Sequence, residues 1–255
     1  MTTIVTKSTE PKVMIHVDNV HKSFDGTPVL QGVSFDVKEG EVVVIIGLSG
    51  CGKSTLLKMV SGLEDYDKGE ISLSDPNYSM VFQYSALFDS LTVWENVGFS
   101  LLEEADFESG LPKRNLTPEE VREIAIEKLN LVELDDVEDK YPNELSGGMK
   151  KRVSFARAIV GNPRIILYDE PTAGLDPVAS TVVEDYILKL RDELGAASVV
   201  VTHQFSTITR TADRVCLLHG GDIKWQGTPE ELMTSDDPYA KQFAEASLDG
   251  PMTED

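Results

Sequence analysis

The chain has only two cysteines among its 255 residues, Cys51 and Cys216. Two thiols cannot form the set of disulfides that stabilises small secreted domains, so cysteine usage gives no sign of an oxidising compartment. Cys216 lies in an apolar stretch and is expected to be a small core residue. Cys51 lies within a short glycine-rich segment, where a disulfide would distort the backbone. Disulfide-based folds are therefore excluded.

Long apolar runs are also absent. No stretch approaches the ~20 residues that a helix needs to cross a bilayer. The polar N-terminus, residues 1–12, lacks the apolar centre of a signal peptide and is expected to be a flexible tail. We therefore expect a cytoplasmic chain. Its hydrophobic content of 41% and charged content of 26% are ordinary for a globular protein.

Positive charge is scarce, because 23 Lys and Arg residues face 44 Asp and Glu residues, and the formal net charge is −21. A surface of that sign repels DNA, RNA and anionic lipid headgroups. We therefore expect no nucleic-acid partner. The basic run at 150–152 is locally unusual in such an acidic chain.

The pattern of apolar residues predicts an α/β protein. Apolar and polar residues alternate over 13–18 and 33–38, which is typical of strands with one buried face. The middle of the chain, 92–160, is mostly helical in pattern, with a helix start at Thr117-Pro118 and an exposed polar loop at 103–116. Further strands are predicted at 42–46, near 70–73 and 79–83, and at 165–168, 198–202, 215–218 and 223–225, with helices at 53–61 and 177–193, a short one after His203 and another from Thr228. Strands that alternate with helices imply a largely parallel sheet with helices on both faces.

A phosphate-binding loop is the strongest motif. It follows the apolar run 42–46 and comprises Gly47, Leu48, Ser49, Gly50, Cys51, Gly52, Lys53 and Ser54. The spacing fits G-x-x-x-x-G-K-[ST] between a buried strand and a helix. Glycines let backbone N–H groups surround a phosphate, Lys53 reaches the outer phosphates, and Ser54 offers a hydroxyl to Mg²⁺. A glycine-rich turn with a chance lysine is the alternative.

Two acids follow a second buried strand. After the apolar residues 165–168 come Asp169 and Glu170. Ligands of open α/β sheets collect at the carboxyl ends of the strands. There Asp169 can hold the Mg²⁺ that Ser54 also contacts, and Glu170 can act as general base on a water. A solvated acidic turn is the alternative.

A third segment, 145–150, predicts a second phosphate site. Ser146 is a natural helix N-cap, and Gly147 and Gly148 leave the N–H groups of the helix start open to an anion. Taken alone, this segment fits a simple capped helix equally well.

Together these motifs, in this order over residues 13–235, resemble the ATP-binding cassette (ABC) ATPases. The resemblance implies a P-loop NTPase fold with a RecA-like core, an N-terminal antiparallel β subdomain and a helical signature subdomain at about 84–160. Residues 236–255 would be a C-terminal extension. It also implies an ATPase that uses ATP and Mg²⁺ and dimerises, so that the signature of one subunit closes over the ATP on the other.

The remaining site residues follow from the same resemblance. Phe24, which by itself would suit a core, matches the aromatic that stacks on adenine. Gln83 matches the glutamine that contacts Mg²⁺, water and the membrane partner. Asp176, in the segment 173–176, matches the loop that crosses the dimer seam. His203 matches the switch histidine on the γ-phosphate. Thr55 completes the nucleotide-binding set.

Finer similarity points to lipid transport. Met149 and the segments 180–185 and 201–208 resemble the corresponding positions in ATPases that work with MCE-domain lipid-binding proteins. These include the ATPases of the Mla-type phospholipid systems of bacterial envelopes and of the chloroplast envelope lipid importer, so the resemblance implies phospholipid transport. This implies a permease and an MCE-type protein as partners, and a peripheral position on the cytoplasmic face of the inner membrane. An apolar set after Gln83 could either receive the permease or pack within its own lobe: Leu87, Phe88, Leu91 and Trp94. The ATPase of another ABC transporter and a soluble non-transport ABC assembly ATPase remain as alternatives.

Overall fold

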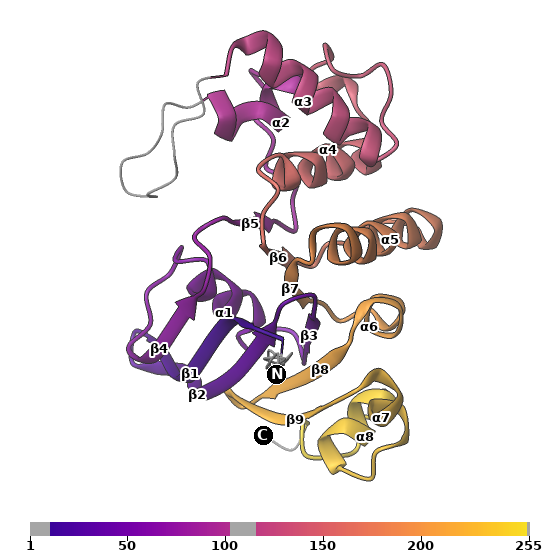
Figure 1. The fold of residues 1–255 in the computed structure, drawn as a ribbon. Helices are drawn as coiled ribbons and strands as arrows, with labels where there is room; N and C mark the ends of the chain where they lie inside the picture. The colour runs from indigo at the N-terminus through magenta and orange to yellow at the C-terminus, as the bar shows by residue number, and fades with distance from the viewer. Residues whose placement is uncertain (1–10, 103–115, 254–255) are drawn as a thin grey trace, which may run out of the picture.

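The computed structural model describes residues 11–102 and 116–253, so residues 1–10 of the predicted tail and residues 103–115 of the predicted loop lie outside it. Two sheets organise the described chain (Figure 1). The first is antiparallel, with the strand order β2-β1-β4. Its strands are β1 (Val13–Phe24), β2 (Thr27–Lys38) and β4 (Lys68–Leu73). This is the antiparallel β subdomain that the sequence predicts.

Strand β1 is longer than its alternating pattern predicts. The alternation over 13–18 ends at Asn19, whose φ of 48° is left-handed. The pairing of β1 with β2 shifts register between Val17 and Val20, and pairing then continues to Phe24. A bulge adds a residue to one strand and reverses the faces that follow, which is why a period-two pattern could not reveal the second half of β1.

The second sheet has six strands in the order β5-β6-β7-β3-β8-β9. All of its pairs are parallel except the edge pair of β8 with β9. The strands are β3 (Val42–Ile46), β5 (Tyr78–Val81), β6 (Ile165–Asp169), β7 (Ala197–Val201), β8 (Arg214–His219) and β9 (Asp222–Gly227). Strand β5 ends two residues before the predicted boundary, so Gln83 lies beyond the strand.

Helices cover both faces of this parallel sheet, as predicted. Alternate residues of β3 belong to different cores: Val44 faces one, and Val43 and Ile45 face the other. Every residue of β3, β6 and β7 is buried. Parallel strands covered on both faces are continuously apolar, which explains why these three segments stand out in the sequence.

The helices form two groups. In Figure 1, α2 (Val93–Leu102), α3 (Pro118–Leu131) and α4 (Gly147–Ile159) make a separate lobe at the top. Thr117 caps α3 in a capping box with Glu120, as its sequence predicts. The others are α1 (Lys53–Val60), α5 (Pro177–Leu194), α6 (Phe205–Thr211), α7 (Pro229–Thr234) and α8 (Pro238–Ala244), with a 3₁₀ turn at Pro142–Glu144.

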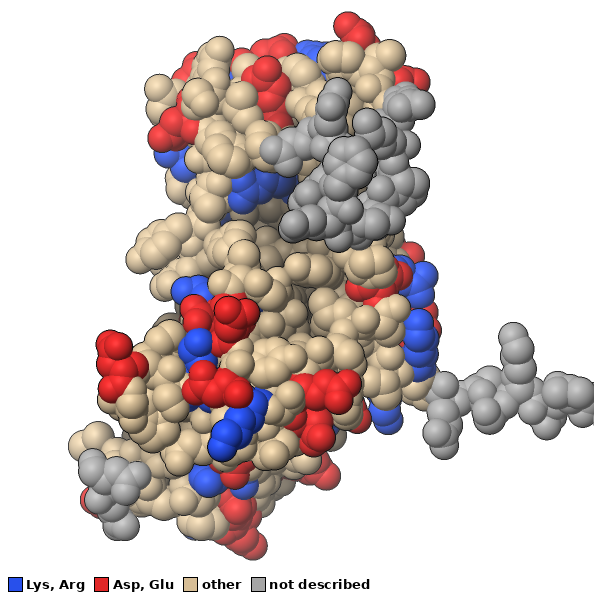
Figure 2. All heavy atoms as spheres, turned by 90° about the vertical axis from the view of Figure 1, so that its left-hand side faces the viewer, with Lys and Arg blue, Asp and Glu red and all other residues tan. Residues whose placement is uncertain are grey.

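The described residues bear on the expectations for membrane spans, surface charge and Cys216. In the described part of the chain, no helix combines the length and apolar character needed to cross a bilayer. Figure 2 shows acidic and basic side chains interspersed over the face that carries the antiparallel sheet. Cys216 is fully buried in β8, as expected, and burial raises its thiol pKa to about 11.

Candidate functional site

The candidate site lies at the carboxyl edge of the parallel sheet. Strands β5, β6, β7 and β3 are neighbours and run parallel, so their last residues meet at one edge. The loop 47–54 follows β3, Glu170 follows β6, His203 follows β7, and Gln83 follows β5. Four segments that are far apart in the sequence are therefore brought together by strand order.

The loop after β3 requires glycine at two positions. Gly47 has φ 151°, and a Cβ there would lie 2.3 Å from the carbonyl oxygen of Leu218. Gly52 has φ 103°, and its Cβ would lie 2.9 Å from the side chain of Leu30. The first contact is with backbone of β8 and cannot relax by a rotamer change. These glycines let the backbone turn between β8 and β2 and enter α1.

Lys53 and Ser54 open helix α1 and face the loop and the sheet edge. The Lys53 ammonium, only 8% exposed, donates to the carbonyls of Gly47 at 2.9 Å and Leu48 at 3.0 Å, so it lies inside the curl of the loop. The Ser54 hydroxyl donates to Oδ1 of Asp169 at 2.8 Å. The sequence separates Ser54 from Asp169 by 115 residues, yet the fold places them in contact, as the metal assignment requires.

Asp169 is suited to a hard cation. Burial raises the pKa of its carboxyl group, and the Ser54 hydrogen bond partly opposes that shift. A bound divalent cation would offset the cost of burying the Asp169 carboxylate as a charged group. Carboxylate and hydroxyl oxygens are ligands that Mg²⁺ accepts. The described residues contain no cluster of three or more His, Cys, Asp and Glu side chains that could hold a metal without further ligands. The donor set therefore fits a Mg²⁺ that also takes oxygens from phosphate and water.

Glu170 and His203 form a pair next to this carboxylate. Oε1 of Glu170 lies 2.8 Å from Nδ1 of His203. Glu170 has φ 48°, in the left-handed region, and its amide donates to Val201 at the end of β7. Its second carboxylate oxygen, Oε2, is buried and has no hydrogen-bond partner among the described residues. A carboxylate oxygen that accepts no hydrogen bond within the protein can accept a proton from water, which is the chemistry of a general base.

Two other predicted site residues, Gln83 and Phe24, lie just after strand β5 and at the end of strand β1. Gln83 is exposed, and the segment after it is held by Arg157, which donates to the carbonyls of Ser85 and Ala86. Phe24, 43% exposed, ends β1, and the Lys22 ammonium lies 4.7 Å from its ring centroid. The sequence gives no signal for Arg157, because its acceptors are carbonyls 71 and 72 residues away.

Asp176 caps its own helix in the structure. Its carboxylate accepts from the amides of Val178 and Ala179 at 3.0 Å each, at the start of α5. That role is structural within one chain. Asp176 itself is exposed, so it remains open to contact from another molecule.

The predicted second phosphate site lies in the other lobe. Ser146 caps α4 by accepting from the amide of Met149, as its sequence predicts. A Cβ on Gly147 or Gly148 would meet no atom within 4 Å, so this helix start is open. Helix α4 packs on α2, α3 and β5, and Figure 1 shows it in a different lobe from α1. One chain therefore does not bring Ser146 to its own loop 47–54.

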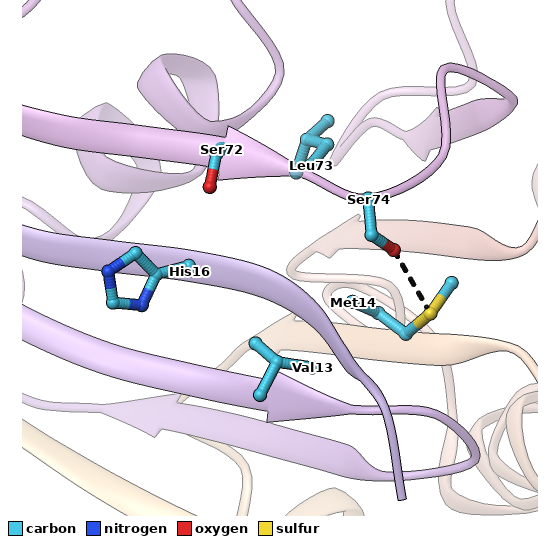
Figure 3. Close-up of a pocket in the computed structure, with 6 residues that line it drawn as sticks. All are labelled: Val13, Met14, His16, Ser72, Leu73 and Ser74. Carbon is cyan, nitrogen blue, oxygen red and sulfur yellow. Dashed lines mark hydrogen bonds between the residues drawn. The ribbon is translucent and has the colours of Figure 1, made fainter.

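A separate shallow pocket lies where β1 begins and β4 ends (Figure 3). It is lined by Val13, Met14, His16, Ser72, Leu73 and Ser74. Its one ionisable group, His16, pairs with Asp36 at 2.5 Å, and this hydrogen bond raises the pKa of His16. The pocket lacks the glycine-rich turn and the lysine of the β3 loop. It does not compete with the sheet edge as a triphosphate site.

Comparison with known proteins identifies the family. Residues 30–173 match the family model described as ABC transporter. The chain belongs to the ABC transporter family. It is 45% identical to the protein TRIGALACTOSYLDIACYLGLYCEROL 3, chloroplastic, of Arabidopsis thaliana, over 94% of this chain and 76% of that protein. It is 36% identical to the sulfate/thiosulfate import ATP-binding protein CysA of Pseudomonas syringae pv. tomato, over 86% of this chain and 68% of that protein.

Solved structures agree with this assignment. The dimeric structure of MJ0796, a bacterial ABC transporter cassette, superposes with a TM-score of 0.76 at 32% identity and covers 85% of this chain and 99% of that one. A second MJ0796 structure, a post-hydrolysis state bound to ADP and Pi, gives the same TM-score. The predicted ABC ATPase fold is confirmed. This ABC ATPase binds and hydrolyses ATP to drive transport.

Proposed function

We propose that this ABC ATPase powers a lipid transporter, together with a membrane permease and an MCE-type lipid-binding protein. The observation that supports this most is the 45% identity, over 94% of the chain, to a protein whose name refers to a galactolipid. The import ATPases for sulfate and thiosulfate are similar at 36% over 86% of the chain. The similarity of segments 180–185 and 201–208 to MCE-linked ATPases supports the same choice.

The geometry supports a role for each part of the sheet edge. The loop from Gly47 to Ser54, with Thr55, would bind the phosphates of ATP, and Phe24 would stack on its adenine. Ser54, Asp169 and Gln83 would hold Mg²⁺, which when bound offsets phosphate charge. Glu170 would take the proton of the attacking water, and His203, 2.8 Å from it, would hold that carboxylate in place and contact the γ-phosphate.

Dimerisation follows from the separation of the two phosphate sites. Because Ser146 lies in the other lobe, the open helix start at Ser146, Gly147 and Gly148 could close a site only on a second copy. MJ0796, which this chain resembles, has a dimeric structure. Each of two ATPs would then lie between the loop 47–54 of one copy and the signature of the other, with Asp176 at the seam.

The surface after Gln83 suits a permease. Within the predicted apolar set, Leu87 and Trp94 pack against the core, whereas Phe88 remains 44% exposed. Tyr84 is 79% exposed. Exposed aromatic side chains are common at protein interfaces. Through this contact the chain would sit on the cytoplasmic face of the inner membrane.

Purification of the native complex from membranes tests the lipid assignment. We expect the ATPase to recover with a permease, an MCE-domain protein and bound lipid, as identified by mass spectrometry. Recovery with the permease of a solute importer would reject the lipid assignment and leave the ATPase intact. A protein found wholly in the cytosol, and never with membranes, would favour a soluble assembly ATPase.

Dimerisation should respond to salt in an unusual direction. Each copy carries a net charge of −21, so two copies repel. Screening extends over ~30 Å at 0.01 M salt but ~8 Å at 0.15 M. ATP-dependent dimerisation, measured by light scattering in a variant that cannot hydrolyse ATP, should therefore weaken when salt is lowered. A dimerisation constant that is the same at both salt concentrations would contradict this expectation.

A further inference from the structure

A chain of buried hydroxyl groups connects the segment after His203 with the loop after Glu170. Thr172, Thr207 and Glu184 are each fully buried. The Thr207 hydroxyl, on α6, donates to Oε1 of Glu184 on α5 at 2.9 Å. The hydroxyls of Thr172 and Thr207 lie 3.0 Å apart. The three side chains come from three different segments of the chain.

The Glu184 carboxylate fixes the donor and the acceptor of each hydrogen bond in this series of hydroxyl groups. An ionised Glu184 can only accept hydrogen bonds, so the single proton of the Thr207 hydroxyl is committed to it. Thr207 must then accept from Thr172, whose hydroxyl becomes the donor. Arg210, whose side chain is 43% exposed, lies with its Nε 2.9 Å from the other carboxylate oxygen of Glu184 and forms an ion pair with it. Each group therefore has one orientation.

Thr172 lies inside the turn that shapes Glu170. The amide of Ala173 donates to the carbonyl of Glu170 at 3.1 Å, which closes a turn around Thr172. The Gln204 side chain, next to His203, donates to the carbonyl of Thr172 at 3.3 Å. From the opposite side, Lys151 on α4 donates to the carbonyl of Ala173 at 2.5 Å. These contacts hold the backbone that keeps Glu170 at a positive φ.

We propose that Thr207, with Thr172 and Glu184, is a positioning residue for hydrolysis: the hydroxyl chain ties α6 to the turn 170–173 and aligns the Glu170 carboxylate beside His203. This rests on the proposed role of Glu170 as general base. The hydroxyl chain also connects segments 180–185 and 201–208, the two segments in which the sequence resembles MCE-linked ATPases.

The test combines Thr207→Val with Glu170→Gln. Valine has nearly the shape of threonine but lacks the hydroxyl, so Thr172 and Glu184 lose their shared partner. We expect kcat per ATP-binding site to fall at least about 10-fold, while KM for ATP stays within about threefold, because a small displacement of a catalytic group slows the chemical step. Thr207→Ser, which keeps the hydroxyl, should retain at least about half the activity. In the Glu170→Gln background, Thr207→Val should cause no further loss in single-turnover hydrolysis.

Thr209→Val is the matched control. Thr209 lies on the same helix, is exposed, and its hydroxyl bonds only to the helix backbone at Phe205 and Ser206. The Thr209→Val variant should hydrolyse ATP at the normal rate. Thr172→Val breaks the chain at its other end and should give the same loss as Thr207→Val, with no added effect in the double variant. It also serves if Thr207→Val yields little folded protein.

Three results would overturn the proposal. They are normal kcat in Thr207→Val and Thr172→Val, an equal loss from Thr207→Val in the Glu170→Gln background, and no recovery in Thr207→Ser. If Glu170→Gln turns over ATP slowly while Thr207→Val turns it over normally, only the proposed role of the hydroxyl chain is rejected. If Glu170→Gln itself turns over normally, the base assignment fails and the positioning role fails with it.

Discussion

Glu170→Gln is expected to slow ATP turnover at least ~10²-fold, which corresponds to ~2.7 kcal/mol of activation free energy. Glutamine keeps the shape of the side chain and can still hydrogen bond to His203, which lies 2.8 Å from Oε1. It cannot take a proton from water. The variant should therefore fold, bind ATP and accumulate as an ATP-bound dimer. Phosphate release measures the turnover, and size-exclusion chromatography with ATP measures the trapped dimer.

Glu193→Gln provides the control for that experiment. Glu193 is an exposed acid near the end of α5, and the same chemical change there should leave turnover unaltered. Near-normal turnover in Glu170→Gln would remove Glu170 from its role. In that case the unpaired Oε2 of Glu170 would need another explanation.

Lys53→Ala is the second variant with a large expected effect. The ammonium is buried inside the loop, at 2.9 Å from the carbonyl of Gly47 and 3.0 Å from that of Leu48. Charge-assisted hydrogen bonds to phosphate are strong where water is excluded. Alanine should weaken ATP binding at least about 10²-fold or abolish turnover, as measured by titration with a fluorescent ATP analogue and by phosphate release.

The nearby Lys58 distinguishes a specific contact from a general loss of positive charge. Lys58 lies on the same helix but is exposed, and Lys58→Ala should change ATP affinity by less than about threefold. An unchanged ATPase in Lys53→Ala would contradict the assignment of the loop. Equal losses in the two variants would mean that net charge, and not the position of Lys53, governs binding.

The phosphate loop could be predicted from the sequence because its residues are consecutive. Its function depends on backbone turns at Gly47 and Gly52 and on the residues that follow directly, Lys53 and Ser54. The central strands could be predicted for a related reason: β3, β6 and β7 are buried on both faces and are therefore mainly apolar. Strand ends were less accurate, and the second half of β1 was missed at the Asn19 bulge.

The contacts between distant segments could not be predicted in the same way. Asp169 and Glu170 are adjacent in sequence, but one faces Ser54 and the other faces His203. The direction of the Glu170 side chain depends on its left-handed φ, which non-glycine residues rarely adopt. No local sequence pattern predicts that backbone conformation. Arg157 and Lys151 act through backbone carbonyls, and any residue type supplies a carbonyl.

By itself, the sequence determined the chemistry available to this protein: a loop that can bind phosphates, two acids at a strand end, and an open helix start at Ser146. Each of these depends on a few consecutive residues and the local backbone that they favour. Only the tertiary structure decided which groups meet. The order β5-β6-β7-β3 brings Gln83, Glu170, His203 and Lys53 to one edge, and the packing of α5 on α6 buries the hydroxyl chain of Thr172 and Thr207. Such contacts depend on the path of the whole chain, and no short stretch of residues encodes that path.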